Sequence, residues 1–329
     1  MSMATFDYPF ADRPASRVAL GCMHFGGNRN LGETDKTDSL RKGRKALETA
    51  LAAGINFFDH ADIYGGGESE EVFGELIEEM AVPRDSILIQ TKCGIRFADN
   101  PRPGDPHRYD FSENHILRSV ESSLRRLRND RIDILLLHRP DALMEPEEIA
   151  VAFAKLHASG KVRAFGVSNH TPAQMDLLRD TLPFPVVANQ VEINLLKTSL
   201  IDAGIVSAGR EPAPGHPADG SLEYHRLHGI VTQAWAPLAY GYLSGRKPDT
   251  DDPRIKPTAD LVQELAETHS VPPESIVIAW LLRHPAGIHP IVGTRDPARI
   301  KACARATHLR LNREEWYRLY IAGRGTPLP

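Results

Sequence analysis

The sequence predicts an α/β protein in which eight parallel strands close into a single (β/α)8 barrel. Short apolar runs alternate with amphipathic helical segments along the whole of the 329-residue chain, and there are eight such runs. Parallel strands joined by helices follow right-handed crossovers, and eight such units suffice to close a barrel of the TIM type. No linker-like change in composition divides the chain, so we expect one domain over residues 1–329.

The expected strands have interiors of Val, Ile, Leu, Phe and Ala. In chain order they cover residues 17–23, 56–60, 87–93, 132–139, 163–169, 186–193, 229–237 and 287–294. A doubly wound sheet is the structural alternative. It is disfavoured because the first strand leads into LGCMHFGGNRN, which lacks the G-x-G-x-x-G turn that such sheets use for dinucleotides.

Apolar residues at helical spacing predict the helices between these strands. They cover residues 39–54, 70–80, 113–129, 146–160, 172–182, 259–270 and 313–323, and RDPAR (295–299) opens a further helix after the last strand. Two stretches rich in Gly, Pro and polar residues, 96–111 and 201–221, predict long loops after the third and sixth strands.

Composition limits the classes of partner. A net charge of −4 and a pI near 6.4 argue against nucleic acid or an anionic membrane, because both attract a basic face. The three cysteines, Cys22, Cys93 and Cys303, are far apart and lack the spacing of metal ligands, so we expect free thiols and no metal. No stretch is apolar enough to span a membrane or act as a leader. We expect a cytoplasmic protein with a small-molecule partner, a monomer or a weak homo-oligomer.

The C-terminal ends of the expected strands carry the polar residues of interest. In a barrel these ends share one face, so their side chains converge. The residues in question are Met23, Asp59, Lys92, His138, Ser168, Asn169, Gln190, Trp235, Gly293 and Thr294. Since the strand interiors are apolar, polar groups confined to one end predict a functional site there.

Taken singly, these residues also have structural explanations. Asp59 could cap the following turn, Lys92 could extend to solvent or form a structural ion pair with Asp59, and His138 could be a satisfied core histidine. By strand alternation, His60 and Asp62 should point away from Asp59, toward the helix layer or solvent.

Three glycines, Gly65–Gly67, predict a tight turn into a helix capped by Ser69. The glutamates at positions 68, 70 and 71 argue against a phosphate cradle in that turn, because they would repel an anion.

Together, four of these residues form a coherent group for acid catalysis. Reduction of a carbonyl needs a proton donor beside the oxygen, and Tyr64 is a weak acid with an ordinary pKa of about 10. The ammonium of Lys92 favours the phenolate and lowers that pKa, while Asp59 holds the ammonium charged and oriented. A neutral His138 can donate a hydrogen bond to the same oxygen.

Seven blocks of sequence resemble the aldo/keto reductase superfamily in order and spacing. They are FDHADIYGG, QTKCG, LLLHRPD, GVSNH, NQVEIN, AWAPLAYG and PIVGTRDPAR. The resemblance covers residues 17–320 and is greatest to a bacterial branch of oxidoreductases related to the YdhF protein. It implies that Tyr64 is the proton donor, Lys92 lowers its pKa, Asp59 supports Lys92, and His138 orients the carbonyl.

The resemblance also implies an NADPH/NADP+ site. Trp235 would stack on the nicotinamide ring, Ser168, Asn169 and Gln190 would hold its carboxamide, and Arg295 or Arg299 would pair with the 2′-phosphate. Backbone groups of residues 235–245 would follow the pyrophosphate. The full set of implied cofactor contacts is Gly21, Met23, Asp59, Ser168, Asn169, Gln190, Trp235, Ala236, Pro237, Leu238, Gly241, Gly293, Thr294, Arg295 and Arg299.

The chain departs from the family pattern at two places. Cys303 stands where the family has an Asn or Glu near the adenine, and Met23–His24–Phe25 replaces the first-strand Trp near the substrate. Two other functions stay open. Lys92 could form a Schiff base in an aldolase-like barrel, or the chain could be a non-catalytic NADP(H) sensor.

Overall fold

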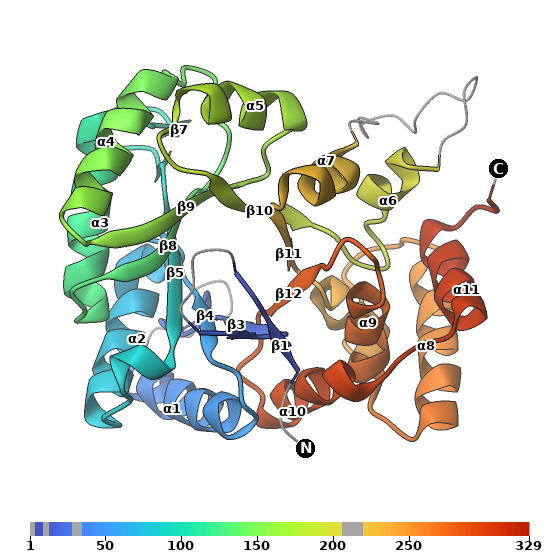
Figure 1. Ribbon diagram of the computed structural model, residues 1–329. Coiled ribbons are helices and arrows are strands. Elements are labelled where there is room, and N and C mark those ends of the chain that lie inside the picture. The colour runs from blue at the N-terminus through green and yellow to red at the C-terminus, as the bar shows by residue number, and fades with distance from the viewer. Residues whose placement is uncertain (1–3, 9–12, 28–34, 206–219, 329) are drawn as a thin grey trace.

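Eight parallel strands form a closed barrel at the centre of the molecule (Figure 1). The computed structural model describes residues 4–8, 13–27, 35–205 and 220–328. The barrel strands are β3 (Ala19–Gly21), β4 (Phe57–Asp59), β5 (Leu88–Cys93), β8 (Ile132–Leu137), β9 (Val162–Ser168), β10 (Val186–Glu192), β11 (Val231–Trp235) and β12 (His289–Val292). They are adjacent in this order, and β12 pairs with β3 to close the ring. The (β/α)8 prediction and all eight predicted strands are confirmed.

The predicted helices surround this barrel (Figure 1). They are α1 (Lys36–Ala52), α2 (Glu68–Glu79), α3 (Glu113–Leu127), α4 (Pro146–Ala158), α5 (Pro172–Thr181), α8 (Ile255–His269), α10 (Pro297–Arg305) and α11 (Arg313–Arg324). Capping boxes begin α5, where Thr171 and Gln174 bond reciprocally, and α11, where Asn312 and Glu315 do the same. Short 3-10 turns occur at Arg84–Ser86 and Ala306–His308.

Three helices were not predicted. The helix α9 (Pro273–Leu282) is apolar on all sides and almost wholly buried, so it has no amphipathic period to detect. The short helices α6 (Ser199–Ala203) and α7 (Ser221–His228) overlap the ends of the predicted loop 201–221. The middle of that loop, residues 206–219, lies outside the described residues.

Two small hairpins lie outside the barrel sheet. The strands β6 (Ile95–Arg96) and β7 (Arg108–Tyr109) pair within the predicted loop 96–111. The strands β1 (Thr5–Phe6) and β2 (Ala15–Ser16) pair near the N-terminus. After β1, Tyr8 is buried with its ring 5.4 Å from that of Phe57. The N-terminal segment therefore fills the end of the barrel where the strands begin.

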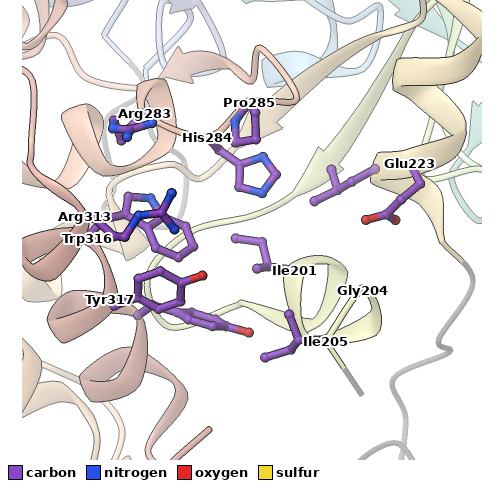
Figure 2. Close-up of a pocket in the computed structure, with 12 residues that line it drawn as sticks. Ile201, Gly204, Ile205, Glu223, Arg283, His284, Pro285, Arg313, Trp316 and Tyr317 are labelled. Atoms are coloured by element: carbon purple, nitrogen blue, oxygen red, sulfur yellow. The ribbon is translucent and has the colours of Figure 1, made fainter. Parts of the chain in front are cut away.

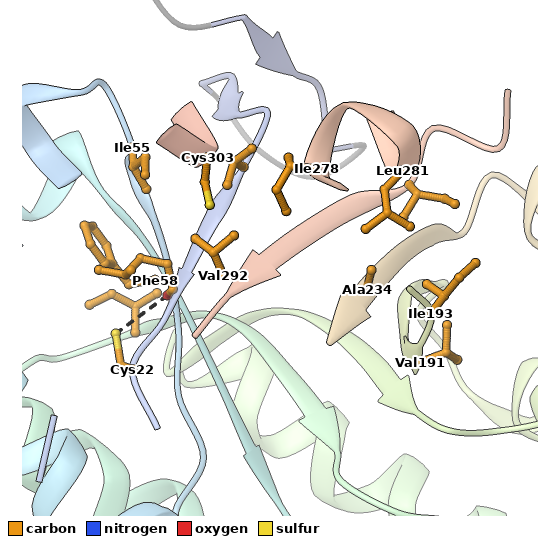
Figure 3. Packing of buried hydrophobic residues seen from close by; sticks show 14 of the residues in the cluster. Cys22, Ile55, Phe58, Val191, Ile193, Ala234, Ile278, Leu281, Val292 and Cys303 are labelled. Atoms are coloured by element: carbon orange, nitrogen blue, oxygen red, sulfur yellow. Dashed lines mark hydrogen bonds between the residues drawn. The ribbon is translucent and has the colours of Figure 1, made fainter. Parts of the chain in front are cut away.

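The core has two parts because successive residues of a strand point to opposite faces. One cluster lies between strands and helices and includes Phe58, Val292 and Leu281 (Figure 3). A smaller cluster fills the barrel and includes Phe57 and Ile134. None of the helices in the described ranges has the length and apolarity needed to cross a membrane.

A buried carboxylate ties several segments together at the end where the strands begin. Asp133, the second residue of β8, accepts hydrogen bonds from Arg84 Nη2 at 2.7 Å and from the amide of Ile89 at 2.8 Å. Arg13 and Arg163 approach the same carboxylate at 3.6 Å each. Because this group lies opposite the end that carries the candidate site, we assign it to stability.

We expect Asp133→Ala to lower the free energy of unfolding by about 3 kcal/mol, since it leaves inward-facing guanidinium groups without their shared anion. Guanidinium chloride denaturation followed by circular dichroism measures this loss. Asp85→Ala is the matched control, because Asp85 pairs with Arg131 at the surface and is 85% exposed. Equal effects of the two changes would contradict the assignment.

Candidate active site

A lysine buried in the barrel joins a carboxylate to a phenol. Lys92 Nζ donates to both carboxylate oxygens of Asp59 at 2.8 Å and to the carbonyl of His60 at 2.7 Å. It also lies 3.2 Å from the hydroxyl oxygen of Tyr64. The side chain of Lys92 is fully buried and that of Asp59 is 4% exposed. The strand ends of β4 and β5 thus bring together three of the four predicted catalytic residues.

The electrostatics of this group differ in one respect from the sequence prediction. Burial pulls the pKa of Lys92 down, but Asp59 and Tyr64 together outweigh burial, so the pKa lies above its ordinary value. Burial raises the pKa of Tyr64, and although Lys92 lowers it, the net shift is upward. Lys92 thus lowers the pKa of Tyr64 as predicted, but desolvation of the phenolate is the larger effect, so the pKa lies above its ordinary value. Tyr64 is held as a protonated donor.

The fourth predicted residue, His138, stands beside Tyr64. Their ring centroids are 6.0 Å apart and the rings meet edge to face. Burial, the charge of Lys92 and the charge of Arg139 hold the pKa of His138 well below its usual value, so the imidazole is neutral. A neutral imidazole can donate one hydrogen bond, as a carbonyl-orienting group requires.

The turn that presents Tyr64 depends on its glycines. A 3-10 turn spans Tyr64–Gly67, and the φ angles of Gly65, Gly66 and Gly67 are 61°, 70° and 102°. A Cβ at Gly67 would stand 2.9 Å from Cδ of Arg126. The helix α2 begins directly afterwards with Gly67 as its N-cap, so the predicted cap at Ser69 is wrong. The Ser69 hydroxyl instead donates to the carbonyl of Met23 at 2.9 Å and ties the loop after β3 to α2.

A column of amides runs through the barrel below Asp59, where the sequence predicted apolar residues only. Gln90 Nε2 donates to Asp59 Oδ1 at 2.6 Å, and Gln190 Nε2 donates to the same oxygen at 3.0 Å. Gln90 and Gln233 exchange hydrogen bonds of 2.7 and 2.8 Å. Gln233 also donates to the Tyr8 hydroxyl at 2.9 Å. The prediction of a wholly apolar interior is therefore wrong.

The alternation of side chains along each strand could have predicted that these glutamines point into the barrel. Gln90 lies two residues before Lys92, and Gln233 two before Trp235, so each glutamine shares the inward face with a predicted site residue. These amides satisfy the buried carboxylate of Asp59 and hold it in one orientation.

The predicted nicotinamide contacts form a chain of side chains. Ser168 Oγ donates to the carbonyl of Gln190 at 2.8 Å, and Asn169 Nδ2 donates to Ser168 Oγ at 2.7 Å. Trp235 Nε1 donates to Asn169 Oδ1 at 3.1 Å. The ends of β9, β10 and β11 thus bring together Ser168, Asn169 and Trp235, while the side chain of Gln190 points down toward Asp59.

The segment after β11 has a backbone that non-glycine residues seldom adopt. Ala236, Ala239 and Tyr240 have φ angles of 48°, 47° and 59°, around a 3-10 turn at Ala239–Ser244. Together with Asn169 they are four of the eight non-glycine residues with positive φ in the described chain. Such conformations cluster at sites that bind ligands. Within this segment Pro237 is buried and Leu238 is partly buried.

The predicted phosphate residues lie against this segment. A Cβ at Gly241 would stand 3.4 Å from Nη1 of Arg299 and 3.4 Å from Cβ of Arg246. Gly293 is exposed, and Thr294 and Arg295 are partly exposed. The start of α10 is already capped, because the Asp296 carboxylate accepts from the amides of Ala298 and Arg299 at 2.7 and 3.4 Å. These two amides are therefore not free to bind a phosphate.

Three further predicted positions are placed as follows. Gly21 pairs in register with Asp59, and Met23, two residues later, is 52% exposed. Cys303 is fully buried and packs near Val292 and Ile278 (Figure 3). Its thiol is therefore not presented to a bound adenine.

His60 and Asp62 face the helix layer, as alternation predicted. The His60 ring lies 4.4 Å from that of Phe73 on α2, and burial followed by the charge of Lys92 lowers its pKa to about 3. Burial, then the charge of Glu70, raises the pKa of Asp62 to about 7. Alternation had left the position of Asp62 open between the helix layer and solvent.

A separate pocket of about 380 Å³ lies on the flank of the barrel (Figure 2). Its walls come from α6, α7, α11 and the segment after α9, including Trp316, Tyr317 and Arg283. It contains none of the predicted catalytic or cofactor residues.

Comparison with known proteins agrees with this geometry. Residues 17–322 match the model of the "Aldo/keto reductase family". The chain is 37% identical over 292 residues to the oxidoreductase YdhF of Escherichia coli, covering 88% of this chain and 90% of that one. It is 37% identical over 312 residues to a 6-dehydroglucose reductase of Agrobacterium fabrum, covering 94% and 95%. A glycerol dehydrogenase structure from Gluconobacter oxydans matches with a TM-score of 0.79 and 28% identity, covering 100% and 98%. The resemblance drawn from the sequence motifs is confirmed.

The Lys92–Asp59 pair gives a prediction about stability. Lys92→Met and Asp59→Asn should each lower the free energy of unfolding by roughly 3–5 kcal/mol, because each leaves a buried charge without its partner. The double variant should lose less than the sum of the two single losses. Urea denaturation of the four proteins measures the coupling. Additive losses would contradict a direct interaction between the two charges.

Proposed function

Because the chain belongs to the aldo/keto reductase family, we propose that it reduces an aldehyde or ketone to an alcohol with NADPH, and that Tyr64 donates the proton. Family membership makes it an oxidoreductase of this type. The observation that carries the finer proposal is the ammonium of Lys92, which stands between the carboxylate of Asp59 and the hydroxyl of Tyr64.

The proposed mechanism assigns one task to each residue. Bound NADPH would supply a hydride to the carbonyl carbon. Tyr64 donates its proton to the carbonyl oxygen as negative charge develops there, and Lys92 stabilises the phenolate that remains. His138, held neutral, donates a hydrogen bond to the same oxygen and so orients the carbonyl. Asp59 and its two amide donors keep Lys92 in place.

The residues at the barrel mouth fit a nicotinamide dinucleotide. The partly exposed edge formed by Trp235 and Asn169 suits a flat amide-bearing ring. The segment Ala236–Gly241, which contains several residues with positive φ, suits a pyrophosphate that approaches the backbone. We assign Arg295 and Arg299 to the 2′-phosphate. Arg299 Nε also lies 3.4 Å from Glu274 Oε1, which orients its guanidinium.

The Schiff-base alternative is disfavoured by the state of Lys92. A lysine nucleophile must lose its proton, but Asp59 and Tyr64 raise the pKa of Lys92 despite its burial. The sensor alternative differs from the proposal in turnover only. Binding of NADPH without reduction of any aldehyde, followed at 340 nm over a panel of aldehydes, ketones and quinones, would favour it.

The substrate class follows in part from the relatives. Since the similar proteins include a 6-dehydroglucose reductase and a glycerol dehydrogenase, we propose a small polar carbonyl compound as substrate. Several further expectations are still predictions. They are a cytoplasmic location, a single domain, the absence of nucleic-acid and membrane partners, and a monomeric or weakly associated state.

Tyr64→Phe should keep NADPH binding and lower kcat by roughly 10²–10⁴-fold, the range expected when a positioned general acid is lost. The change deletes the hydroxyl and keeps the ring. Steady-state kinetics with the best aldehyde measure kcat, and fluorescence titration measures the Kd for NADPH. Tyr224→Phe on α7 is the matched control and should behave as wild type. A near wild-type rate for Tyr64→Phe would rule out Tyr64 as the donor.

Replacing both Arg295 and Arg299 with alanine should raise the Kd for NADPH by about 10- to 150-fold, the effect of losing a charged hydrogen-bonding partner. The Kd for NADH should change little, because NADH has no 2′-phosphate. Parallel titrations with the two cofactors measure the difference. Equal losses of affinity for NADPH and NADH would mean that the arginines support the loop and do not bind the 2′-phosphate. A preference of the wild-type protein for NADH would overturn the cofactor assignment.

A further inference from the structure

Arg139 lies at the barrel mouth beside the proposed catalytic group, with its guanidinium against an aromatic ring. Arg139 directly follows His138 at the end of β8, and its guanidinium carbon lies 5.7 Å from the centroid of the Trp235 ring on β11. The strands β9 and β10 separate β8 from β11 in the barrel. The side chains of Arg139 and Trp235 therefore meet across the rim between β8 and β11, where Trp235 also bonds Asn169.

Within the described ranges, the Arg139 guanidinium donates no hydrogen bond and pairs with no carboxylate. Glu192, at the end of β10, instead accepts a hydrogen bond from the Tyr240 hydroxyl at 3.2 Å. By contrast, Arg96 on the nearby hairpin pairs with Asp110 at 2.6 Å. A guanidinium has five donors in a planar fork that matches a carboxylate or similar anion. Arg139 thus offers its full donor set to a ligand.

The charge of Arg139 also affects His138 in the proposed catalytic group. It is one of the three causes that lower the pKa of His138, after burial and Lys92. The charge of Lys92 is balanced by Asp59, whereas no carboxylate among the described residues contacts Arg139. The mouth beside His138 therefore favours an anion.

We propose that Arg139 binds an anionic group of the carbonyl substrate, so that the enzyme prefers aldehydes or ketones bearing a carboxylate or sulfonate. The inference rests on the proposed function and deepens it. Arg139 and His138 are neighbours in sequence, so one substrate can place its carbonyl at His138 and its anion at Arg139. The side chain of Trp235 then packs between this anion site and the predicted nicotinamide contact Asn169.

The test compares benzaldehydes whose para group is anionic or neutral. 4-Formylbenzoate, its methyl ester and 4-formylbenzenesulfonate are assayed with NADPH on wild type, Arg139→Ala, Arg139→Lys and the control Arg118→Ala, which removes an exposed arginine from the outer face of α3. Arg139→Ala should lower kcat/KM for the two anions by about 10- to 100-fold and for the ester by less than about 3-fold. Arg139→Lys should recover part of the loss, because it keeps the charge without the fork. The anion with the larger loss identifies the preferred group.

Two binding measurements separate the possible failures. The Kd for NADPH should be the same in wild type and Arg139→Ala, and a rise would assign Arg139 to the cofactor and overturn the proposal. Calorimetric titration of 4-formylbenzoate into the NADP+ complex should give weaker binding to Arg139→Ala than to wild type. Equal binding of 4-formylbenzoate to the two proteins would overturn the role of Arg139, whether or not any aldehyde is reduced. If Arg139→Ala binds 4-formylbenzoate more weakly but wild type reduces no aldehyde, only the proposed reaction is overturned.

Discussion

The buried pair of Lys92 and Asp59 is the interaction on which the site depends. Two charges inside a barrel are tolerated only when each is paired and its remaining hydrogen-bonding groups are satisfied. Here the amides of Gln90 and Gln190 donate hydrogen bonds to Asp59. The backbone carbonyl of His60 accepts a hydrogen bond from Lys92. The amide column down to Tyr8 is a consequence of placing this pair at the centre of the fold.

The same pair decides the protonation states around it. Burial raises the pKa of Tyr64 more than Lys92 lowers it, and burial together with nearby positive charge keeps His138 neutral. The site therefore holds two proton or hydrogen-bond donors side by side, with a protonated lysine next to Tyr64. This arrangement suits delivery of a proton to an oxygen that gains negative charge, and it does not suit a lysine nucleophile.

The two ends of the barrel use charge in different ways. At the end where the strands begin, the carboxylate of Asp133 is surrounded by the guanidinium groups of Arg13, Arg84 and Arg163. At the other end, Arg139 lies against Trp235, and no carboxylate among the described residues contacts it. Asp133 joins arginines from separate segments of the chain, whereas the role proposed for Arg139 is to bind an anionic ligand.

The sequence by itself determined the order of strands and helices and the positions of the strand-end residues. Periodicity and strand length are local, and a (β/α)8 barrel brings all strand ends to one face, so Asp59, Lys92 and His138 could be placed near one another before any coordinates. It did not reveal α9, because a helix buried on every side has no amphipathic pattern. Only the tertiary structure decided that Gln90, Gln190 and Gln233 form a column under Asp59, that the pKa of Tyr64 rises, and that Arg139 meets Trp235. Each of these depends on burial and on contacts between strands far apart in the chain, which a one-dimensional pattern does not contain.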